Sequence, residues 1–358
     1  MTTTPAGPLS LGELDRGPRR TWQRVDLGPV LDGTYAPPQA TVGRRTDGVG
    51  MFYPGRQHSI ASDSEAGKTW LALLAAQSEL DAGNAVLYLD FEDDEGGTVG
   101  RLMALGAKSE DIAARFGYVK PEEAIDSLFG REDLSELLGD LRPTLAILDG
   151  ITEAMSMHGL ELKDNTDIAR FGRLLPRYIA DKGAATVALD HVVKDREGRG
   201  RYAIGGVHKL NGINGASYVL DNRQPFGIGR TGRTSVYIAK DRPAQLRRHA
   251  LPGQEGLFWF GDLVVESHDM GFAEGMVSPP AQGDGKFRPT TLMARVSAAL
   301  QGAPGPLTMT DITDRVKGQA QTVRGAVAAL VDEGHIVMET GPRGAKLHRL
   351  VKPFGDTP

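Results

Sequence analysis

The sequence predicts an α/β protein in which a mainly parallel sheet is covered by helices on both faces and is followed by a smaller C-terminal domain. Continuous apolar runs of strand length alternate with helical segments up to about residue 216, which is typical of parallel strands buried on both faces. Beyond that point, short strands are joined by links that contain glycine or proline. This change indicates an antiparallel extension of the same sheet.

Composition places the chain among ordinary globular proteins. It has 358 residues, of which 40% are hydrophobic and 24% charged, so two domains are expected. The absence of cysteine excludes disulfides and thiolate metal sites and fits a reducing cytoplasm. No apolar run approaches the ~18 residues of a membrane span, and no signal peptide is visible. We therefore expect a cytoplasmic protein without membrane contact. Because the net charge is −5, contact with nucleic acid would need local basic patches.

The composition also divides the chain into four parts. Residues 1–40 are rich in proline, glycine and threonine, and we expect a flexible arm. Residues 41–270 hold the alternating strands and helices of the main domain. Residues 271–286 have the composition of a linker. Residues 287–354 are expected to fold as a separate small domain.

One segment of small residues has the pattern of a phosphate-binding P-loop: Ser62-Asp63-Ser64-Glu65-Ala66-Gly67-Lys68-Thr69. It lies between a short strand over 57–61 and a helix that opens on Gly-Lys-Thr, which a chance match in a surface turn would lack. The loop N–H groups and the helix N-terminus favour phosphate. Lys68 would reach the β- and γ-phosphates, and the Thr69 hydroxyl would bind Mg²⁺. The pattern asks for glycine where Ser62 stands, and serine enters positive φ less easily. The tightness of the loop is therefore open.

The other elements of the main domain follow from periodicity and length. A hairpin is expected before the P-loop strand, and Gly83 is expected just after the first helix, as its C′ residue. Expected helices cover residues 68–81, 96–106, 109–115, 133–141 and 165–181. Expected strands cover residues 85–91, 144–149, 184–190, 217–220, 235–239 and 257–260.

Acidic residues and a histidine end three of the buried strands. In an open parallel sheet the carboxyl ends of strands line the ligand crevice, so Asp149 is expected beside the P-loop, holding Mg²⁺ through water. The alternative is an aspartate that caps the next turn. His191 could contact the γ-phosphate or be a structural histidine. Four carboxylates compete to polarise the attacking water: Asp90, Glu92, Asp93 and Asp94.

The order of these motifs resembles the RecA-like ATPases, and most closely the RepA-type hexameric helicases of plasmids and phages, near DnaB. The resemblance covers about residues 50–250 and rests on the P-loop, Leu-Asp-Phe-Glu, Leu-Asp-Gly, Asp-His-Val-Val-Lys and Ala-Lys-Asp-Arg-Pro. It implies a RecA-like P-loop NTPase core that uses ATP and Mg²⁺, with Glu92 as catalytic base and Asp149 on the metal. It implies a homo-hexameric ring that moves on single-stranded DNA in replication.

The same resemblance implies that Lys240 and Arg242 act as cationic fingers on the ATP of a neighbouring subunit. The two residues alternate along a strand end, so both can point the same way. Two cations there would stabilise the charge that develops on the transferred phosphoryl group. The alternative is an exposed basic strand end.

The resemblance also places the loops over 153–165 and 193–209 at the central channel of the ring. The second loop is rich in cations that could follow a phosphate backbone, and Tyr202 could stack on a base. Without the resemblance, a solvated loop would be preferred. The candidate DNA-binding residues are Lys194, Arg196, Arg199, Arg201 and Lys209.

The small C-terminal domain is expected to be a winged helix, with helices over 290–301, 309–317 and 320–333 before a two-stranded hairpin. Gln319, Gln321, Thr322 and Arg324 open the third helix, where helix-turn-helix proteins read base edges. Between residues 283 and 358 there are 10 Lys/Arg and 7 Asp/Glu, a net charge of +3. Duplex DNA and a protein surface are both possible partners.

Two other functions remain open at this point. One is a RecA-like recombination or repair ATPase that does not unwind DNA. The other is a DNA-binding regulator whose P-loop acts as a nucleotide switch.

Overall fold

The structure is a computed structural model that describes residues 22–191, 210–268, 271–280 and 290–354. The chain separates into two compact units, residues 1–37 and 38–358. The described residues of the first unit, 22–37, contain one short helix, α1 (Gly28–Leu31), which buries no side chain. Among the described residues, no helix is both long enough and apolar enough to cross a bilayer.

A ten-stranded sheet forms the centre of the second unit, in the order β10-β11-β9-β8-β3-β7-β6-β4-β5, with β12 paired to β11. Neighbouring strands from β5 to β8 run parallel, and the strands beyond β8 are antiparallel. The predicted mixed sheet is therefore confirmed. The parallel strands are β3 (Gln57–Ser62), β4 (Val86–Asp90), β5 (Phe116–Val119), β6 (Leu145–Asp149), β7 (Ala185–His191) and β8 (Ala216–Gln224). The antiparallel strands are β9 (Thr231–Asp241), β10 (Leu251–Pro252), β11 (Phe258–His268) and β12 (Phe272–Ser278).

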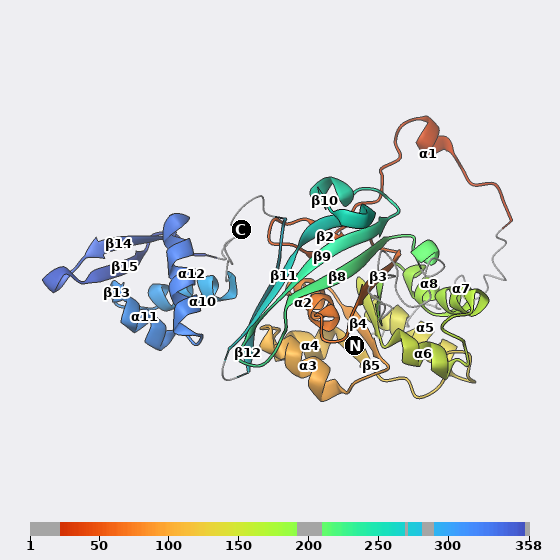
Figure 1. Ribbon diagram of the computed structural model, residues 1–358, viewed down its shortest axis with the longest axis horizontal. Coiled ribbons are helices and arrows are strands. Elements are labelled where there is room, and N and C mark those ends of the chain that lie inside the picture. The colour runs from red at the N-terminus through yellow and green to blue at the C-terminus, as the bar shows by residue number, and fades with distance from the viewer. Residues whose placement is uncertain (1–21, 192–209, 269–270, 281–289, 355–358) are drawn as a thin grey trace, which may run out of the picture. The chain divides into compact units, whose positions relative to one another are not determined.

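Helices cover both faces of the parallel part of the sheet (Figure 1). One face carries α2 (Lys68–Asp81), α3 (Glu95–Ala104) and α4 (Ser109–Arg115). The other carries α5 (Gly130–Leu141), α6 (Ile151–Met157), α7 (Asn165–Leu174) and α8 (Pro176–Ala180). Strand β6 supplies both cores by alternation: Leu145 and Ile147 pack with α2, and Ala146 and Leu148 pack on the opposite face. Burying each such large side chain stabilises the fold by about 1.5–3 kcal/mol.

A small hairpin precedes the P-loop strand, as the sequence predicts. It consists of β1 (Val42–Arg44) and β2 (Gly50–Phe52). The hairpin is tied to α2, because the Gly43 N–H donates to Glu79 Oε1 at 3.0 Å. Helix α2 itself ends as predicted, with Gly83 at φ +79° directly after the C-cap residue Ala82.

Several segments differ from the sequence-based expectations, and strand β5 was not predicted. The helix expected over 165–181 is two helices, α7 and α8, because Pro176 lacks an N–H to continue the first. Residues 153–157 of the expected loop belong to α6. Residues 272–278 of the expected linker form β12, which pairs with β11 along its whole length. Residues 281–286 of the expected linker lie outside the described residues.

The C-terminal part contains three helices around a core of its own, together with a three-stranded sheet in the order β13-β15-β14. The helices are α10 (Thr290–Gln301), α11 (Met309–Arg315) and α12 (Ala320–Asp332). The strands are β13 (Leu307–Thr308), β14 (Ile336–Thr340) and β15 (Lys346–Leu350), of which β13 was not predicted. Short 3-10 helices lie at η3 (Arg247–His249), η4 (Gln254–Gly256) and η5 (Pro342–Gly344).

The N-terminal end of α12 packs against strand β11 of the large sheet. The Gln319 N–H donates to His268 Nδ1 at 3.2 Å, and the Thr322 hydroxyl donates to Glu266. Gln321 and Arg324 are exposed. The Gln319 backbone N–H and the Thr322 hydroxyl are therefore engaged by β11, and the reading of base edges by this helix end stays a prediction.

Candidate active site

The P-loop connects β3 to α2 and is anchored from the antiparallel side of the sheet. The Thr234 hydroxyl donates to the Ala66 carbonyl at 2.8 Å, and Asn222 Nδ2 donates to the Glu65 carbonyl at 3.4 Å. In a trans peptide the N–H points opposite to the C=O. The Gly67 N–H is therefore turned away from β9, and Gly67 lines a cleft of about 820 Å³.

The sequence pattern asks for glycine at position 62, but the positive-φ residues of the loop lie at positions 65 and 67. Gly67 has φ +96° and Glu65 has φ +60°, whereas Ser62 is not among the positive-φ residues of the described chain. Ser62 is the last residue of β3, is fully buried, and donates its hydroxyl to the Asp63 carbonyl at 2.7 Å. Serine at this position therefore adds no backbone strain, and the doubt about the tightness of the loop is removed.

Lys68 is the first residue of α2 and is buried, so its ammonium group would approach a phosphate from within the protein. Its Nζ lies 3.4 Å from His191 Nδ1. Burial lowers the pKa of the Lys68 ammonium, and the carboxylates of Asp149 and Glu92 oppose that shift. The cation is therefore held among the strand-end side chains that the sequence singled out.

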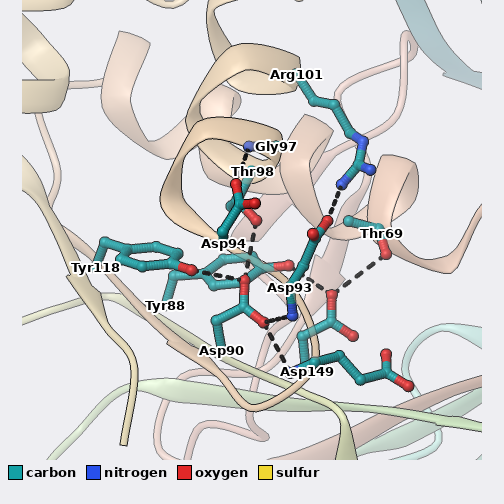
Figure 2. A network of polar contacts seen from close by, with 11 residues as sticks. Thr69, Tyr88, Asp90, Asp93, Asp94, Gly97, Thr98, Arg101, Tyr118 and Asp149 are labelled. Atoms are coloured by element: carbon teal, nitrogen blue, oxygen red, sulfur yellow. Dashed lines mark hydrogen bonds and ion pairs between the residues drawn. The ribbon is translucent and has the colours of Figure 1, made fainter.

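Asp149 ends β6 and faces the start of α2. The Thr69 hydroxyl donates to Asp149 Oδ2 at 3.3 Å, and the Tyr88 hydroxyl donates to the same oxygen at 2.6 Å (Figure 2). The other oxygen, Oδ1, is buried and accepts no hydrogen bond from any described residue. Burial raises the pKa of the Asp149 carboxyl, while the Tyr88 hydrogen bond and the Lys68 charge oppose the increase.

The carboxylates after β4 differ in their contacts, and three of them, Asp90, Asp93 and Asp94, bond within the turn and α3 (Figure 2). Asp90 is fully buried and accepts four hydrogen bonds, from the N–H groups of Glu92 and Asp93 and from the hydroxyls of Thr98 and Tyr118. Asp94 is the N-cap of α3, and Asp93 forms an ion pair with Arg101 at 3.2 Å. Asp90 and Asp94 therefore shape the turn, and Asp93 is held by the helix that follows it.

Glu92 is the carboxylate that turns toward the P-loop. Its Oε1 lies 3.5 Å from His191 Nε2, so His191 bridges Glu92 and Lys68. Gly150, the residue after Asp149, has φ +85°, and a Cβ there would lie 2.9 Å from Glu92 Cγ. Glycine at 150 thus leaves room for the glutamate, a close approach in space that no local sequence pattern signals.

The cleft over the P-loop also has walls that sequence reasoning did not identify. The β8–β9 turn contributes Phe226, whose ring approaches Gly67 so closely that a Cβ on the glycine would lie 2.7 Å from it. Other unpredicted lining residues are Trp70, Arg101, Arg230, His268 and Phe272. No motif marks them, because they come from helix, turn and strand segments brought together only by the fold.

The residues of the cleft fit Mg²⁺ and a nucleoside triphosphate. Thr69 and the bare Asp149 Oδ1 supply oxygen ligands, which Mg²⁺ prefers, and the metal commonly takes its remaining ligands from water and phosphate. Consistently, a search of the described residues finds no group of three or more histidines and acids that could hold a metal alone. Lys68 and the loop N–H groups are suited to the phosphates.

The predicted finger residues do not join this cleft. Lys240 and Asp241 end β9, and Asp241 pairs with Ala216 at the opposite edge of the sheet from the P-loop. Lys240 Nζ donates to the carbonyls of Leu210 and Asn211 at 2.7 and 3.0 Å, while Arg242 is exposed. The five candidate DNA-binding residues, Lys194, Arg196, Arg199, Arg201 and Lys209, lie outside the described residues.

Comparisons with known proteins show what the chain is similar to. Residues 29–197 match the model of a family described as AAA domain. No curated protein sequence matches the chain. Among solved structures, a KaiC-like protein of the hyperthermophilic archaeon Pyrococcus horikoshii is similar at 14% identity over 68% of this chain and 99% of its own, with a TM-score of 0.47. The matched residues include the P-loop, Glu92 and Asp149, so the family match and the site geometry together support a P-loop ATPase domain in this part of the chain.

Proposed function

We propose that the protein is an ATP-hydrolysing, DNA-dependent motor, and specifically a hexameric replicative helicase of the RepA type. The observation that carries the hydrolytic part is the convergence of three strand ends on Lys68. Asp149, Glu92 and His191 come from β6, from the turn after β4 and from β7. They can hold the metal, polarise the attacking water and contact the γ-phosphate, respectively.

The proposal of a ring rests on where the predicted fingers lie. Thr234 contacts the P-loop, and Lys240 is six residues further along the same strand, which corresponds to roughly 20 Å. Neither Lys240 nor Arg242 can therefore serve the ATP of its own subunit without a large rearrangement. A second copy of the chain could bring these cations to the cleft, as in a closed ring whose sites lie between subunits.

Single-stranded DNA is the partner that we propose for the channel of this ring. The support is the glycine-containing basic stretch after β7, with its alternating cations and Tyr202. The stretch begins directly after His191, which contacts both Lys68 and Glu92. DNA bound to this stretch could therefore change the positions of Lys68 and Glu92 through His191.

For the C-terminal part we propose a winged helix. The order of three helices and three antiparallel strands supports it. Exposed cations on and after the last strand, including Lys346, Arg349 and Lys352, could contact the phosphates of duplex DNA. The N-terminal end of α12 is engaged with β11, so any DNA contact would come mainly from the hairpin.

ATP turnover, measured with and without single-stranded DNA, tests the central proposal. We expect turnover to rise when the DNA is added, and we expect Glu92→Gln to bind ATP without hydrolysing it. Turnover that does not respond to single-stranded DNA contradicts a DNA motor. Mass measurement with ATP and DNA present should give a hexamer. A forked-duplex assay separates a helicase, which unwinds the fork, from a recombination ATPase, which does not.

A further inference from the structure

We infer that Tyr88 is a positioning residue of the active site, whose hydroxyl orients the Asp149 carboxylate so that one oxygen stays bare for the metal. This inference rests on the proposed use of Mg²⁺ and ATP at this site. It assigns a function to a fully buried tyrosine that lies on a strand beside the metal-binding aspartate rather than in any motif.

The hydrogen-bond pattern around Asp149 is asymmetric. Tyr88 and Thr69 both donate to Oδ2, and Oδ1 receives no hydrogen bond from the described part of the chain. The Tyr88 contact is the shorter of the two, 2.6 Å against 3.3 Å, and a hydroxyl bound to a carboxylate at that distance forms a strong, charge-assisted hydrogen bond. It therefore fixes the rotation of the carboxylate.

The tyrosine ring is itself held rigidly. Tyr88 stacks on Tyr118 at 6.1 Å between ring centroids and packs against Phe116 at 6.0 Å. Strands β4 and β6 pair so that Asp90 lies opposite Asp149. The register of these two strands thus sets the position of the hydroxyl relative to Asp149, and little freedom remains for the ring to follow a displaced carboxylate.

A neighbouring pair offers a matched control. Tyr118, on β5, donates its hydroxyl to Asp90 Oδ2 at 3.0 Å (Figure 2). Asp90 receives three further hydrogen bonds and builds the turn after β4. The two tyrosines therefore make the same kind of bond to aspartates that end adjacent strands. Of these two aspartates, Asp149 is the one with a buried oxygen that has no partner among the described residues.

The test compares Tyr88→Phe with Tyr118→Phe in the full-length protein. The readout is the Mg²⁺ concentration that half-saturates the binding of a fluorescent ADP analogue, so no turnover is required. Removing a group that orients a metal ligand typically costs 10–100-fold in metal affinity. We therefore expect Tyr88→Phe to need about tenfold more Mg²⁺, with nucleotide binding in the absence of Mg²⁺ unchanged, and Tyr118→Phe to match the wild type.

Thermal melting separates positioning from a loss of stability. A purely structural role would lower the melting temperature in Tyr88→Phe and leave the Mg²⁺ dependence unchanged, and that result overturns the inference. A second check is Tyr88→Phe combined with Asp149→Asn. If Tyr88 acts through Asp149, its substitution adds no further Mg²⁺ defect in that background, whereas an additive defect overturns the inference.

The inference and the proposed function can fail separately. A wild-type protein that binds Mg²⁺ and ADP without hydrolysing ATP contradicts the proposed motor. In that protein the shift in Tyr88→Phe still supports the positioning role, and the absence of a shift still overturns it.

Discussion

The amino ends and the carboxyl ends of the parallel strands form two opposite edges of the large sheet. One buried aspartate at each edge shows how they differ: both oxygens of Asp241 accept hydrogen bonds, and only one oxygen of Asp149 does so among the described residues. At the amino edge, Asp241 accepts the Tyr53 hydroxyl at 2.8 Å and three backbone N–H groups, from Ala244, Leu246 and Arg247. At the carboxyl edge, Asp149 keeps one buried oxygen without a partner among the described residues. The first arrangement closes a turn, and the second leaves a place for a ligand.

The same comparison supports the proposal that a second subunit completes the active site. Parallel strands present their carboxyl ends to a ligand crevice, so Lys68, Glu92 and Asp149 gather at one edge. Strand β9 runs the other way and carries Lys240 and Arg242 to the amino edge. The two finger candidates therefore lie on the side opposite the P-loop, where, in the proposed ring, another copy of the chain would use them.

The largest expected effect on ATP turnover comes from removing the cation of Lys68 at the carboxyl edge. Lys68→Ala should lower ATP turnover by at least about 10³, because both the bound phosphates and the developing charge lose their buried partner. Steady-state ATP hydrolysis and nucleotide binding measure the change. Lys108→Ala, which removes an exposed lysine at the start of α4, is the control and should turn over normally. Normal turnover in Lys68→Ala would contradict the site.

The second effect tests whether the amino edge serves another subunit. Arg242→Ala should lower turnover by on the order of 10² to 10³ and leave ATP binding unchanged, because Arg242 lies far from its own P-loop. Arg248→Ala, which removes an exposed arginine in η3, should leave turnover near the wild-type value.

Mixing two inactive variants sharpens this result. Combined Lys68→Ala and Arg242→Ala subunits should recover part of the activity, because some interfaces then pair an intact P-loop with an intact Arg242. If the mixture stays inactive although both variants assemble, the site is not shared between subunits.

A third, smaller effect concerns the space that Gly150 leaves for Glu92. Gly150→Ala should lower turnover about tenfold to a hundredfold, because a new Cβ would displace the glutamate from the attacking water. Gly159→Ala is the matched control: it also has a positive φ, +65°, but nothing lies within 4 Å of its Cβ position. The two variants should lose similar stability, and only Gly150→Ala should lose turnover. Equal turnover in Gly150→Ala and Gly159→Ala would contradict the proposal that Gly150 makes room for Glu92.

Much of the carboxyl edge could be predicted from the sequence because its signals are local. The P-loop residues are contiguous, and Asp149 and His191 each end a continuous apolar run that only a buried strand explains. The choice of Glu92 among four carboxylates could not be made from the residues, because it depends on which of them cap the turn and α3. Asp90 and Asp94 do so, and the structure alone reveals this.

The features that escaped prediction depend on contacts between segments distant in the sequence. Tyr88 acts on Asp149 across two strands, and the register of those strands cannot be read from either segment alone. Strand β12 has no clear apolar alternation and is held by backbone pairing with β11. Pro176, by contrast, is a local signal for the break between α7 and α8, and the single helix predicted over 165–181 did not take it into account.

The smallest effect on catalysis, and a specific effect on stability, is expected from His58 at the amino edge. His58 Nε2 accepts the Tyr53 N–H at 2.9 Å, and complete burial lowers the pKa of His58 to about 3. In the unfolded chain a histidine binds a proton near pH 6.5. The contribution of His58 to the unfolding free energy is therefore fully present above that pH and is lost as the pH falls toward 3. Lowering the pH from about 7.5 to 5.5 should therefore reduce the unfolding free energy of the wild type by about 1.4 kcal/mol. Urea unfolding at the two pH values measures this drop. In His58→Gln, whose side chain cannot take up a proton, the drop should be smaller by about the same amount. Turnover of this variant at neutral pH should change little. An identical pH dependence in the two proteins would mean that the histidine is already protonated, or exposed, in the folded state.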